Sequence, residues 1–202
     1  MPNLRASAQG FVVVGEPQPK GSRMFAIRAA LFSILLVAGA SAALARPAPN
    51  FAATDLSGRP VSLAQLHGKV VLLDLWASWC APCVAGLPKL LTIESRLRRS
   101  GFVIVGVALD NADAADRNAE AKLRRFVRAH RIDFPIVQLT PAFNADYGRV
   151  LGLKDGKIVA HGLIAASLPS WILIGRDGTI RAIYKSSSQE QQMLTTAARL
   201  AH

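Results

Sequence analysis

Two cysteines, Cys80 and Cys83, are the only thiols of the 202-residue chain, and two residues separate them in the segment Trp-Cys-Ala-Pro-Cys. Thiols at this spacing can form and open a disulfide and so exchange two electrons with a second thiol pair. A zinc site would need further Cys or His residues at ligand spacing, and the four histidines provide no such pair. A structural disulfide that closes so short a loop would restrict the unfolded chain little. The spacing therefore predicts a redox-active dithiol with no bound metal.

The residues on either side place the pair between a strand and a helix. Residues 69–76 form an apolar run of strand length, as a buried central strand requires. Apolar residues then recur at helical spacing over residues 84–97. Cys80 would lie at the helix N-terminus, where unpaired N–H groups and the helix dipole stabilise a thiolate. We therefore predict Cys80 as the nucleophile and Cys83 as the buried thiol that resolves a mixed disulfide.

The two residues inside the motif predict the direction of electron flow. Ala81 and Pro82 carry no charge that would stabilise the Cys80 thiolate, so we expect a dithiol at the reducing end of the known range. Pro82 also suits the first helical turn, where an N–H would have no partner.

Asp74 lies within the apolar strand, six residues before Cys80. A buried carboxylate without a cation has a raised pKa and can exchange a proton with the buried thiol. Asp74 is therefore a third candidate catalytic residue. The alternative is a carboxylate that faces a bound water or a polar group of the core.

These residues resemble a known family. The cysteine motif with Asp74 resembles thioredoxin, and the wider pattern resembles the extracytoplasmic TlpA/ResA branch, the redoxin or AhpC/TSA type. The resemblance covers about residues 47–187. Its further motifs are Pro49-Asn50-Phe51, residues 55–63, residues 68–71, Pro88, Leu168-Pro169 and Arg176-Asp177-Gly178.

The resemblance implies an α/β thioredoxin-like fold, with a central mixed β-sheet flanked by helices and an N-terminal β-hairpin extension. It also implies that Pro169 is cis and packs against the disulfide. The backbone of Leu168 would then pair with an extended client segment, as an added strand. We expect client contacts from Trp79, which would be a partly exposed lid, and from Ala81, Pro82, Leu168 and Pro169.

The sequence departs from the family pattern at two places. Members often carry a Glu three residues after the second Cys, and this position holds Gly86. Residues 149–167 form an insertion before the expected cis-proline, with a turn signal at residues 154–157. We expect this insertion to influence the choice of partner, and a surface hairpin without a role is the alternative.

Several other elements can be assigned from the sequence. The N-terminal part predicts two short strands around a turn at residues 56–60 and one helical turn near residue 64. Alternating strands and helices predict parallel pairing with right-handed crossovers. The remaining elements expected are a strand at 102–109, a helix at 113–130, an ambiguous segment at 134–139, a helix at 143–151, a hairpin of 171–175 with 179–184, and a closing helix at 189–200.

Residues 1–45 are expected to lie outside the domain, which would comprise residues 46–202. Arg23 and Arg28 precede an apolar run that ends in Ala43-Leu44-Ala45, a small-residue cleavage site. We predict a secretory signal peptide, with an uncleaved membrane anchor as the alternative, and hypothesise that Met24 is the true start. The protein would then be periplasmic, or anchored at the inner membrane.

The chain carries a formal charge of +11, and residues 46–202 contain 20 Lys and Arg against 12 Asp and Glu, or +8. Solvated helix faces explain this charge, and attraction to an anionic membrane or to acidic partners is the alternative. No aromatic-basic pattern or nucleic-acid-binding module is present, so we expect no nucleic-acid partner.

The combined prediction is an exported, monomeric thiol-disulfide oxidoreductase that reduces protein disulfides. No ATP, NAD or metal motif is present, so we expect no cofactor. Exported compartments are oxidising, so a membrane dithiol donor must return the electrons. By resemblance, the clients would be apocytochrome c or copper-site proteins.

Three other functions are alternatives to this prediction. A copper-binding module would use Cys80, Cys83 and His161, but its relatives place three residues between the cysteines. A peroxiredoxin-type peroxidase needs a Pro and a Thr or Ser seven and three residues before its reactive Cys, where this chain has Leu73 and Ala77 before Cys80. A net oxidase or isomerase is the third alternative.

Overall fold

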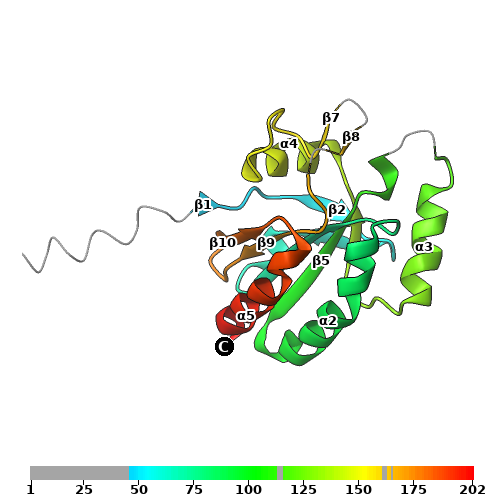
Figure 1. The fold of residues 1–202 in the computed structure, drawn as a ribbon. Coiled ribbons are helices and arrows are strands. Elements are labelled where there is room, and N and C mark those ends of the chain that lie inside the picture. Colours follow the sequence, from blue (N-terminus) through cyan, green and yellow to red (C-terminus); the bar gives the residue numbers. More distant parts are fainter. Residues whose placement is uncertain (1–45, 113–115, 161–162, 165) are drawn as a thin grey trace, which may run out of the picture. The chain divides into compact units, whose positions relative to one another are not determined.

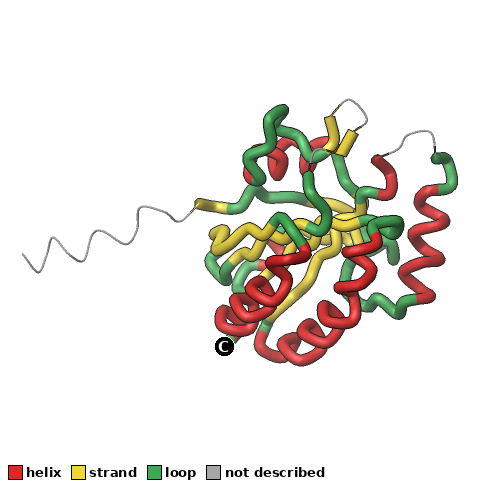
Figure 2. The backbone as a smooth tube through the Cα atoms, in the orientation of Figure 1, coloured by secondary structure: helices red, strands yellow, loops and turns green. Residues whose placement is uncertain are grey.

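A six-stranded mixed sheet runs through the middle of the domain, in the order β1-β10-β9-β4-β5-β6 (Figure 1). The structure is a computed structural model and describes residues 46–112, 116–160, 163–164 and 166–202. Helices lie on the outside of this sheet (Figure 2). The thioredoxin-like α/β fold with a mixed central sheet is confirmed.

The central strands carry the motif. Strand β4 (Val70–Trp76) is buried at every residue and pairs in parallel with β5 (Phe102–Ala108), from Val70 opposite Phe102 to Trp76 opposite Ala108. Its apolar, β-branched start suits a strand covered on both sides. On one side of these two strands, β6 (Ile136–Gln138) pairs in parallel with β5. On the other side the pairing is antiparallel throughout: β9 (Ser170–Ile174) pairs with β4, β10 (Thr179–Tyr184) pairs with β9, and β1 (Arg46–Pro47) pairs with β10.

The N-terminal hairpin extension is also confirmed. Strands β2 (Ala52–Thr54) and β3 (Pro60–Ser62) pair with each other, and the helical turn η1 (Ala64–Leu66) follows. Aromatic side chains pack this extension against helix α4 (Pro141–Val150). Phe51 lies edge-on to Phe143 and Tyr147 of that helix, with ring centroids 5.6 and 6.4 Å away. The Tyr147 hydroxyl also donates to the Pro49 carbonyl at 2.7 Å.

Two helices lie side by side against the sheet. Helix α2 (Ala81–Leu97) continues into the helical turn η2 (Arg98–Ser100) and ends at Gly101, whose φ of 76° is left-handed. Glycine reaches this conformation without a Cβ clash and commonly ends helices. The C-terminal helix α5 (Glu190–Ala201) packs against α2, after the turn η4 (Ser187–Gln189).

The third helix starts later than the sequence predicts. Helix α3 spans Ala119–Ala129, so the predicted start at residue 113 is wrong for residues 116–118, while 113–115 lie outside the described residues. The carboxylate of Asp116 accepts a hydrogen bond from the Asn118 N–H at 3.0 Å. Such a local bond offers the backbone an alternative to the helix. The helical turn η3 (Asp110–Ala112) precedes this segment.

The insertion is bound tightly to the helix before it. Helix α4 (Pro141–Val150) starts at Thr140, whose hydroxyl accepts from the Phe143 N–H at 3.1 Å. Within α4, the Asn144 side-chain amide accepts from the Val159 N–H at 2.7 Å and donates to the Val159 carbonyl at 2.8 Å. Asn144 therefore pairs with the insertion as a neighbouring strand would. Strands β7 (Val159–Ala160) and β8 (Leu163–Ile164) form the short hairpin that follows.

Candidate active site

Cys80 and Cys83 are joined in a disulfide, with an S–S distance of 2.10 Å, at the start of α2. Cys80 is the N-cap residue in an extended conformation, and its sulfur accepts from the Cys83 N–H at 3.3 Å. Both side chains are buried, with 6% and 5% exposed. The predicted position at the helix N-terminus is therefore confirmed. The N–H group and the helix dipole there stabilise negative charge on the Cys80 sulfur.

Three residues next to the cysteines in the chain are apolar and exposed. Trp79, Ala81 and Pro82 are exposed, and Trp79 is the one large apolar residue that is exposed among the described residues, at 59%. Trp76 and Trp171 are instead core residues, each 1% exposed. An exposed indole and an exposed proline ring therefore lie next to the two cysteines in the chain.

The loop that contains Leu168 and Pro169 lies at the same end of the sheet as the cysteines. Leu75, near the end of β4, pairs with Ser170, the first residue of β9. The Leu168-Pro169 bond just before Ser170 is cis, as the family resemblance implied. Because β4 and β9 are antiparallel, this bond lies beyond the end of β4, where the disulfide loop begins. Leu168 is half-buried and Pro169 is buried.

Asp74 is the buried carboxylate that the sequence indicated. Its residue is 2% exposed, and its Oδ1 atom has no hydrogen-bond partner among the described residues. Burial raises the pKa of Asp74 to about 7, and the indole of Trp171, opposite it on β9, partly opposes this rise. No cation contributes to this pKa among the described residues. A carboxyl group of this kind changes its charge near neutral pH and can give or take a proton there.

A second buried carboxylate, Asp110, was not identified from the sequence. It lies in η3, directly after β5, and is 8% exposed. Its two oxygens accept from the Ser78 N–H at 3.1 and 3.3 Å, and Oδ1 also accepts from the Ser78 hydroxyl. The signal available was an acidic residue after a buried parallel strand, since the carboxyl ends of such strands gather functional groups.

The space beside Gly86 is filled by a carboxylate from another helix. A Cβ atom at Gly86 would lie 2.6 Å from Oε1 of Glu190, at the start of α5. The Glu190 side chain is 13% exposed and forms an ion pair with Lys89. The position that often holds a Glu in the family thus has no side chain here, and a Glu from α5 lies against it.

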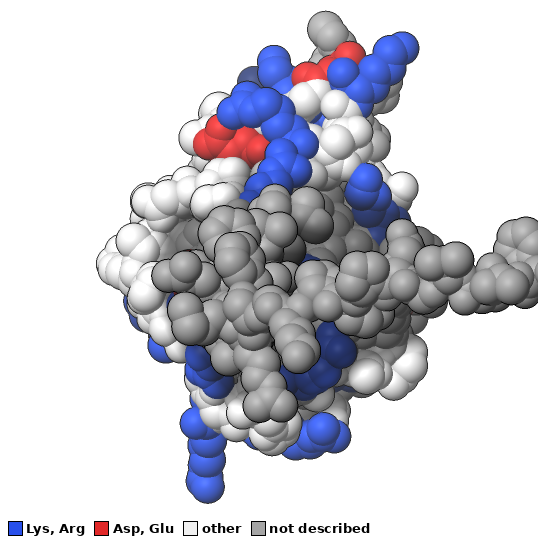
Figure 3. All heavy atoms as spheres, turned by 90° about the vertical axis from the view of Figure 1, so that its left-hand side faces the viewer, with Lys and Arg blue, Asp and Glu red and all other residues white. Residues whose placement is uncertain are grey.

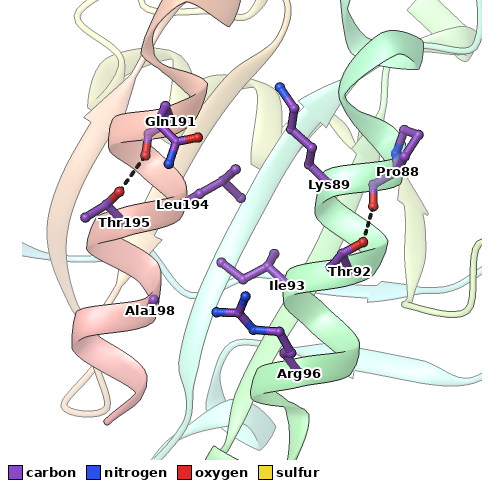
Figure 4. Close-up of a pocket in the computed structure, with 9 residues that line it drawn as sticks. All are labelled: Pro88, Lys89, Thr92, Ile93, Arg96, Gln191, Leu194, Thr195 and Ala198. Carbon is purple, nitrogen blue, oxygen red and sulfur yellow. Dashed lines mark hydrogen bonds between the residues drawn. The ribbon is translucent and has the colours of Figure 1, made fainter.

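A groove of about 550 Å³ lies between α2 and α5, beyond the disulfide end of α2 (Figure 4). Pro88 and Lys89 stand at one end of it, and Ile93 faces Leu194 across it (Figure 4). Pro88 lies inside the helix as expected, and its carbonyl accepts from the Thr92 hydroxyl at 2.7 Å.

The basic residues lie on the surface. Arg96, Arg99, Arg125 and Arg128 are exposed on their helices, and Arg98 pairs with Glu94 and Asp133. On the face that Figure 3 shows, Lys and Arg side chains are spread over several places. These four arginines therefore lie on solvated helix faces.

No helix in the described part of the chain is both long and apolar enough to cross a membrane. Within the same residues, no three or more His, Cys, Asp or Glu side chains form a group that could hold a metal. His161, which the copper hypothesis uses, lies outside the described residues.

Comparison with known proteins agrees with this geometry. A model of the AhpC/TSA family matches residues 44–183. The chain is 28% identical over 151 residues to the thiol-disulfide oxidoreductase ResA of Bacillus thuringiensis, covering 74% of each chain. It is 31% identical over 146 residues to ResA of Halalkalibacterium halodurans, covering 72% of this chain and 70% of that one.

The fold is similar to that of solved structures. One is a thiol:disulfide interchange protein of the thioredoxin family from Chlorobium tepidum, with a TM-score of 0.64, 20% identity, and coverage of 80% of this chain and 100% of that one. Another is StoA from Bacillus subtilis, with a TM-score of 0.51, 21% identity, and coverage of 73% and 95%. At these identities the likeness concerns the fold alone.

Proposed function

Because the chain belongs to the AhpC/TSA family and is a protein-disulfide oxidoreductase of the ResA type, we propose that it works as an exported reductase of client disulfides. The observation that carries this proposal is the Cys80–Cys83 disulfide at the N-terminus of α2, with an uncharged Ala-Pro pair between the sulfurs. Without a charge that favours the thiolate, the reduced form gives up its electrons readily.

The reaction transfers two electrons by thiol exchange. The Cys80 thiolate attacks one sulfur of the client disulfide, forms a mixed disulfide and releases the first client thiolate. The Cys83 thiolate then attacks the Cys80 sulfur and releases the second client thiolate. The client becomes a dithiol, and the enzyme ends in the disulfide form that the structure contains.

Asp74 is the proposed proton carrier for the second half of this reaction. Cys83 is buried, so its thiol must lose a proton inside the protein before it can attack. A carboxyl with a pKa of about 7 is ionised often enough near neutral pH to accept that proton. Position 86 carries no acidic side chain, so Asp74 is the acid–base group on the strand that leads to the cysteines.

Client binding is proposed to use the exposed rim of the disulfide. Trp79, Ala81 and Pro82 provide apolar contact, and the backbone beside Leu168 and Pro169 pairs with an extended client segment. Such backbone pairing accepts many sequences, so further contacts must give specificity. The insertion at residues 149–167 leads directly into this loop and is fixed to α4 by Asn144. It is therefore the proposed source of partner choice.

The proposed location follows from the N-terminal segment. Residues 1–45 are proposed as a signal peptide or an anchor, and residues 46–202 as the exported domain. In an oxidising compartment the Cys80–Cys83 disulfide must be reduced after each cycle, so a membrane dithiol protein is the proposed electron donor. Apocytochrome c and copper-site proteins, whose cysteines must be reduced before they are loaded, are the proposed clients.

The reduction potential of the Cys80–Cys83 pair tests this proposal. The full chain is equilibrated in dithiothreitol or glutathione buffers of defined ratio, and the free thiols are counted. We expect about −250 mV or lower, in the range of reducing thioredoxins. A value near −150 mV would instead identify an oxidant or an isomerase and would remove cytochrome maturation from the proposal, at about 5 kcal/mol for the difference.

Partner choice has a separate test. Cys83→Ala leaves Cys80 able to form the mixed disulfide and unable to release it, so clients and donor remain attached and can be identified by mass spectrometry. Deletion of residues 153–162 in this background should change the set of trapped proteins. An unchanged set would exclude the insertion as a specificity element.

A further inference from the structure

The short loop between β4 and α2 decides where the reactive sulfur lies. It consists of residues 77–80, and its backbone closes through a hydrogen bond from the Cys80 N–H to the Ala77 carbonyl at 3.1 Å. Ser78 and Trp79 are the two central residues of this turn. Four-residue turns can adopt several backbone types, and the commonest of them accepts most residues. Contacts from outside the turn can therefore help to select its geometry.

Asp110 supplies those contacts. Its carboxylate accepts the Ser78 N–H with both oxygens and the Ser78 hydroxyl with one, so all three bonds end on a single residue of the turn. Asp110 is itself fixed, because the Leu109 N–H donates to the Trp76 carbonyl at 2.9 Å and the residue is 8% exposed. Hydrogen bonds to an ionised acceptor are among the stronger ones in proteins.

We propose that Asp110 is a positioning residue for thiol exchange: by holding Ser78, it fixes the turn that presents Trp79 to clients and places the Cys80 sulfur at the N-terminus of α2. When the disulfide opens, the bond between the two sulfurs no longer holds this geometry. The hydrogen bonds from Ser78 to Asp110 do not involve sulfur, so opening the disulfide does not itself break them. The inference rests on the dithiol chemistry proposed above and adds the residue that keeps the nucleophile in place.

The effect of Asp110 on the nucleophile can have either sign, which makes the inference testable. As a positioning group, Asp110 keeps the Cys80 thiolate against the Cys83 N–H and so lowers the thiol pKa. As a negative charge near the loop, it would oppose the thiolate and raise that pKa. Replacing Asp110 therefore slows the reaction of the Cys80 thiolate if positioning dominates, and accelerates it if charge dominates.

The test is the rate at which iodoacetamide alkylates Cys80 in the reduced full-length protein at pH 6. Alkylation requires no client, so its outcome is independent of whether the proposed clients and electron flow are correct. We expect Asp110→Ala to slow alkylation about tenfold, equal to a rise of one unit in the thiol pKa. Asp110→Asn keeps one acceptor oxygen and should fall between Asp110→Ala and the parent. Ser78→Ala removes the hydroxyl only and should slow alkylation about threefold.

Asp177→Asn is the matched control. Asp177 makes the same kind of clamp, since its Oδ1 accepts from the Thr179 N–H at 3.1 Å and from the Thr179 hydroxyl at 2.8 Å. It lies in the β9–β10 turn, at the end of the sheet opposite to the disulfide, because Ile174 pairs with Val71 at the start of β4. We expect Asp177→Asn to leave alkylation unchanged even where it lowers the melting temperature.

Three results would overturn the inference. The first is alkylation of Asp110→Ala and Asp110→Asn at the parental rate or faster. The second is slowing by Asp177→Asn to the same degree. The third concerns folding: if Asp110→Ala fails to fold, Ser78→Ala decides alone, and an unchanged rate in that variant excludes positioning through Ser78.

Discussion

Asp74 and Asp110 are both buried aspartates beside the loop that carries the disulfide, and they differ in what their oxygens contact. Asp74 lies within β4, 2% exposed, with Oδ1 unpartnered in the described structure and a pKa raised to about 7. Asp110 follows β5, 8% exposed, and accepts three hydrogen bonds from Ser78.

The difference shows that burial alone does not assign a role to a carboxylate. Asp74 has lost water and its Oδ1 has no donor among the described residues, so burial dominates: the carboxyl holds its proton up to neutral pH and can pass it on. Asp110 has exchanged water for the donors of Ser78, which hold its oxygens in one place. The first arrangement suits proton transfer, and the second suits the fixing of a loop.

The largest expected difference between the two aspartates concerns the rate of client reduction. Asp74→Asn removes the group that accepts the Cys83 proton, so we expect client reduction at pH 7 to fall roughly 10²- to 10⁴-fold. The rate should also lose its dependence on a group that titrates near pH 7. Stopped-flow measurement of the resolution step between pH 5 and 9 checks both points. A variant that keeps the parental pH profile would contradict the proton role of Asp74.

The second difference concerns the pH dependence of stability. The pKa of Asp74 is about 7 when folded and near the ordinary 3.8 when unfolded, so the folded state binds more protons between these values. The contribution of Asp74 to the free energy of unfolding is therefore fully present below pH 3.8 and is lost as the pH rises to about 7. The total decrease is roughly 4 kcal/mol. Urea unfolding at pH 4 to 8 should show this decline in the parent and a shallower one in Asp74→Asn.

Asp110→Asn should change stability in another manner. It replaces one of the two acceptor oxygens that bind Ser78 with an NH₂ group, so we expect a loss of about 1–3 kcal/mol at pH 7. At the same pH, Asp74→Asn removes a carboxyl that is unfavourable when charged and should not destabilise the protein to this degree. Chemical unfolding of both variants at pH 7 compares them directly. Equal losses would remove the distinction between the two carboxylates.

The smallest expected effect comes from the neighbour of Asp74. Trp171 holds the pKa of Asp74 lower than burial alone would, so Trp171→Phe should raise that pKa above about 7. The pH at which the resolution step reaches half its maximal rate should rise with it. Trp76→Phe is a suitable control, because Trp76 is equally buried and does not contribute to this pKa. An equal shift in both variants would point to packing rather than to the Trp171 indole.

Much of this fold could be predicted from local sequence. The apolar run of β4, the helix that starts at Cys80 and the β9–β10 hairpin each follow from hydrophobic periodicity or turn residues close in the chain. The position of Asp74 was predictable as well, because a single acidic residue interrupts a buried strand. The cis bond before Pro169 followed from the family resemblance rather than from local pattern.

The remaining features depend on residues far apart in the chain. Asp110 and Ser78 are separated by 32 positions, and neither residue type indicates the other. Asn144 pairs with Val159 across 15 positions. The late start of α3 follows from a competing bond at Asp116, which periodicity does not detect. Tertiary contact, which the linear pattern does not contain, selects each of these.

The contact between Gly86 and Glu190 has a consequence for how this protein can change. The Glu190 carboxylate, paired with Lys89, occupies the space that a side chain at position 86 would need. A side chain at position 86 would therefore require the end of the Glu190 side chain to move. Grafting the first helix of a relative that carries a Glu there would place two carboxylates in one volume and displace Glu190 from Lys89. Exchanging α2 together with the start of α5 would avoid this displacement.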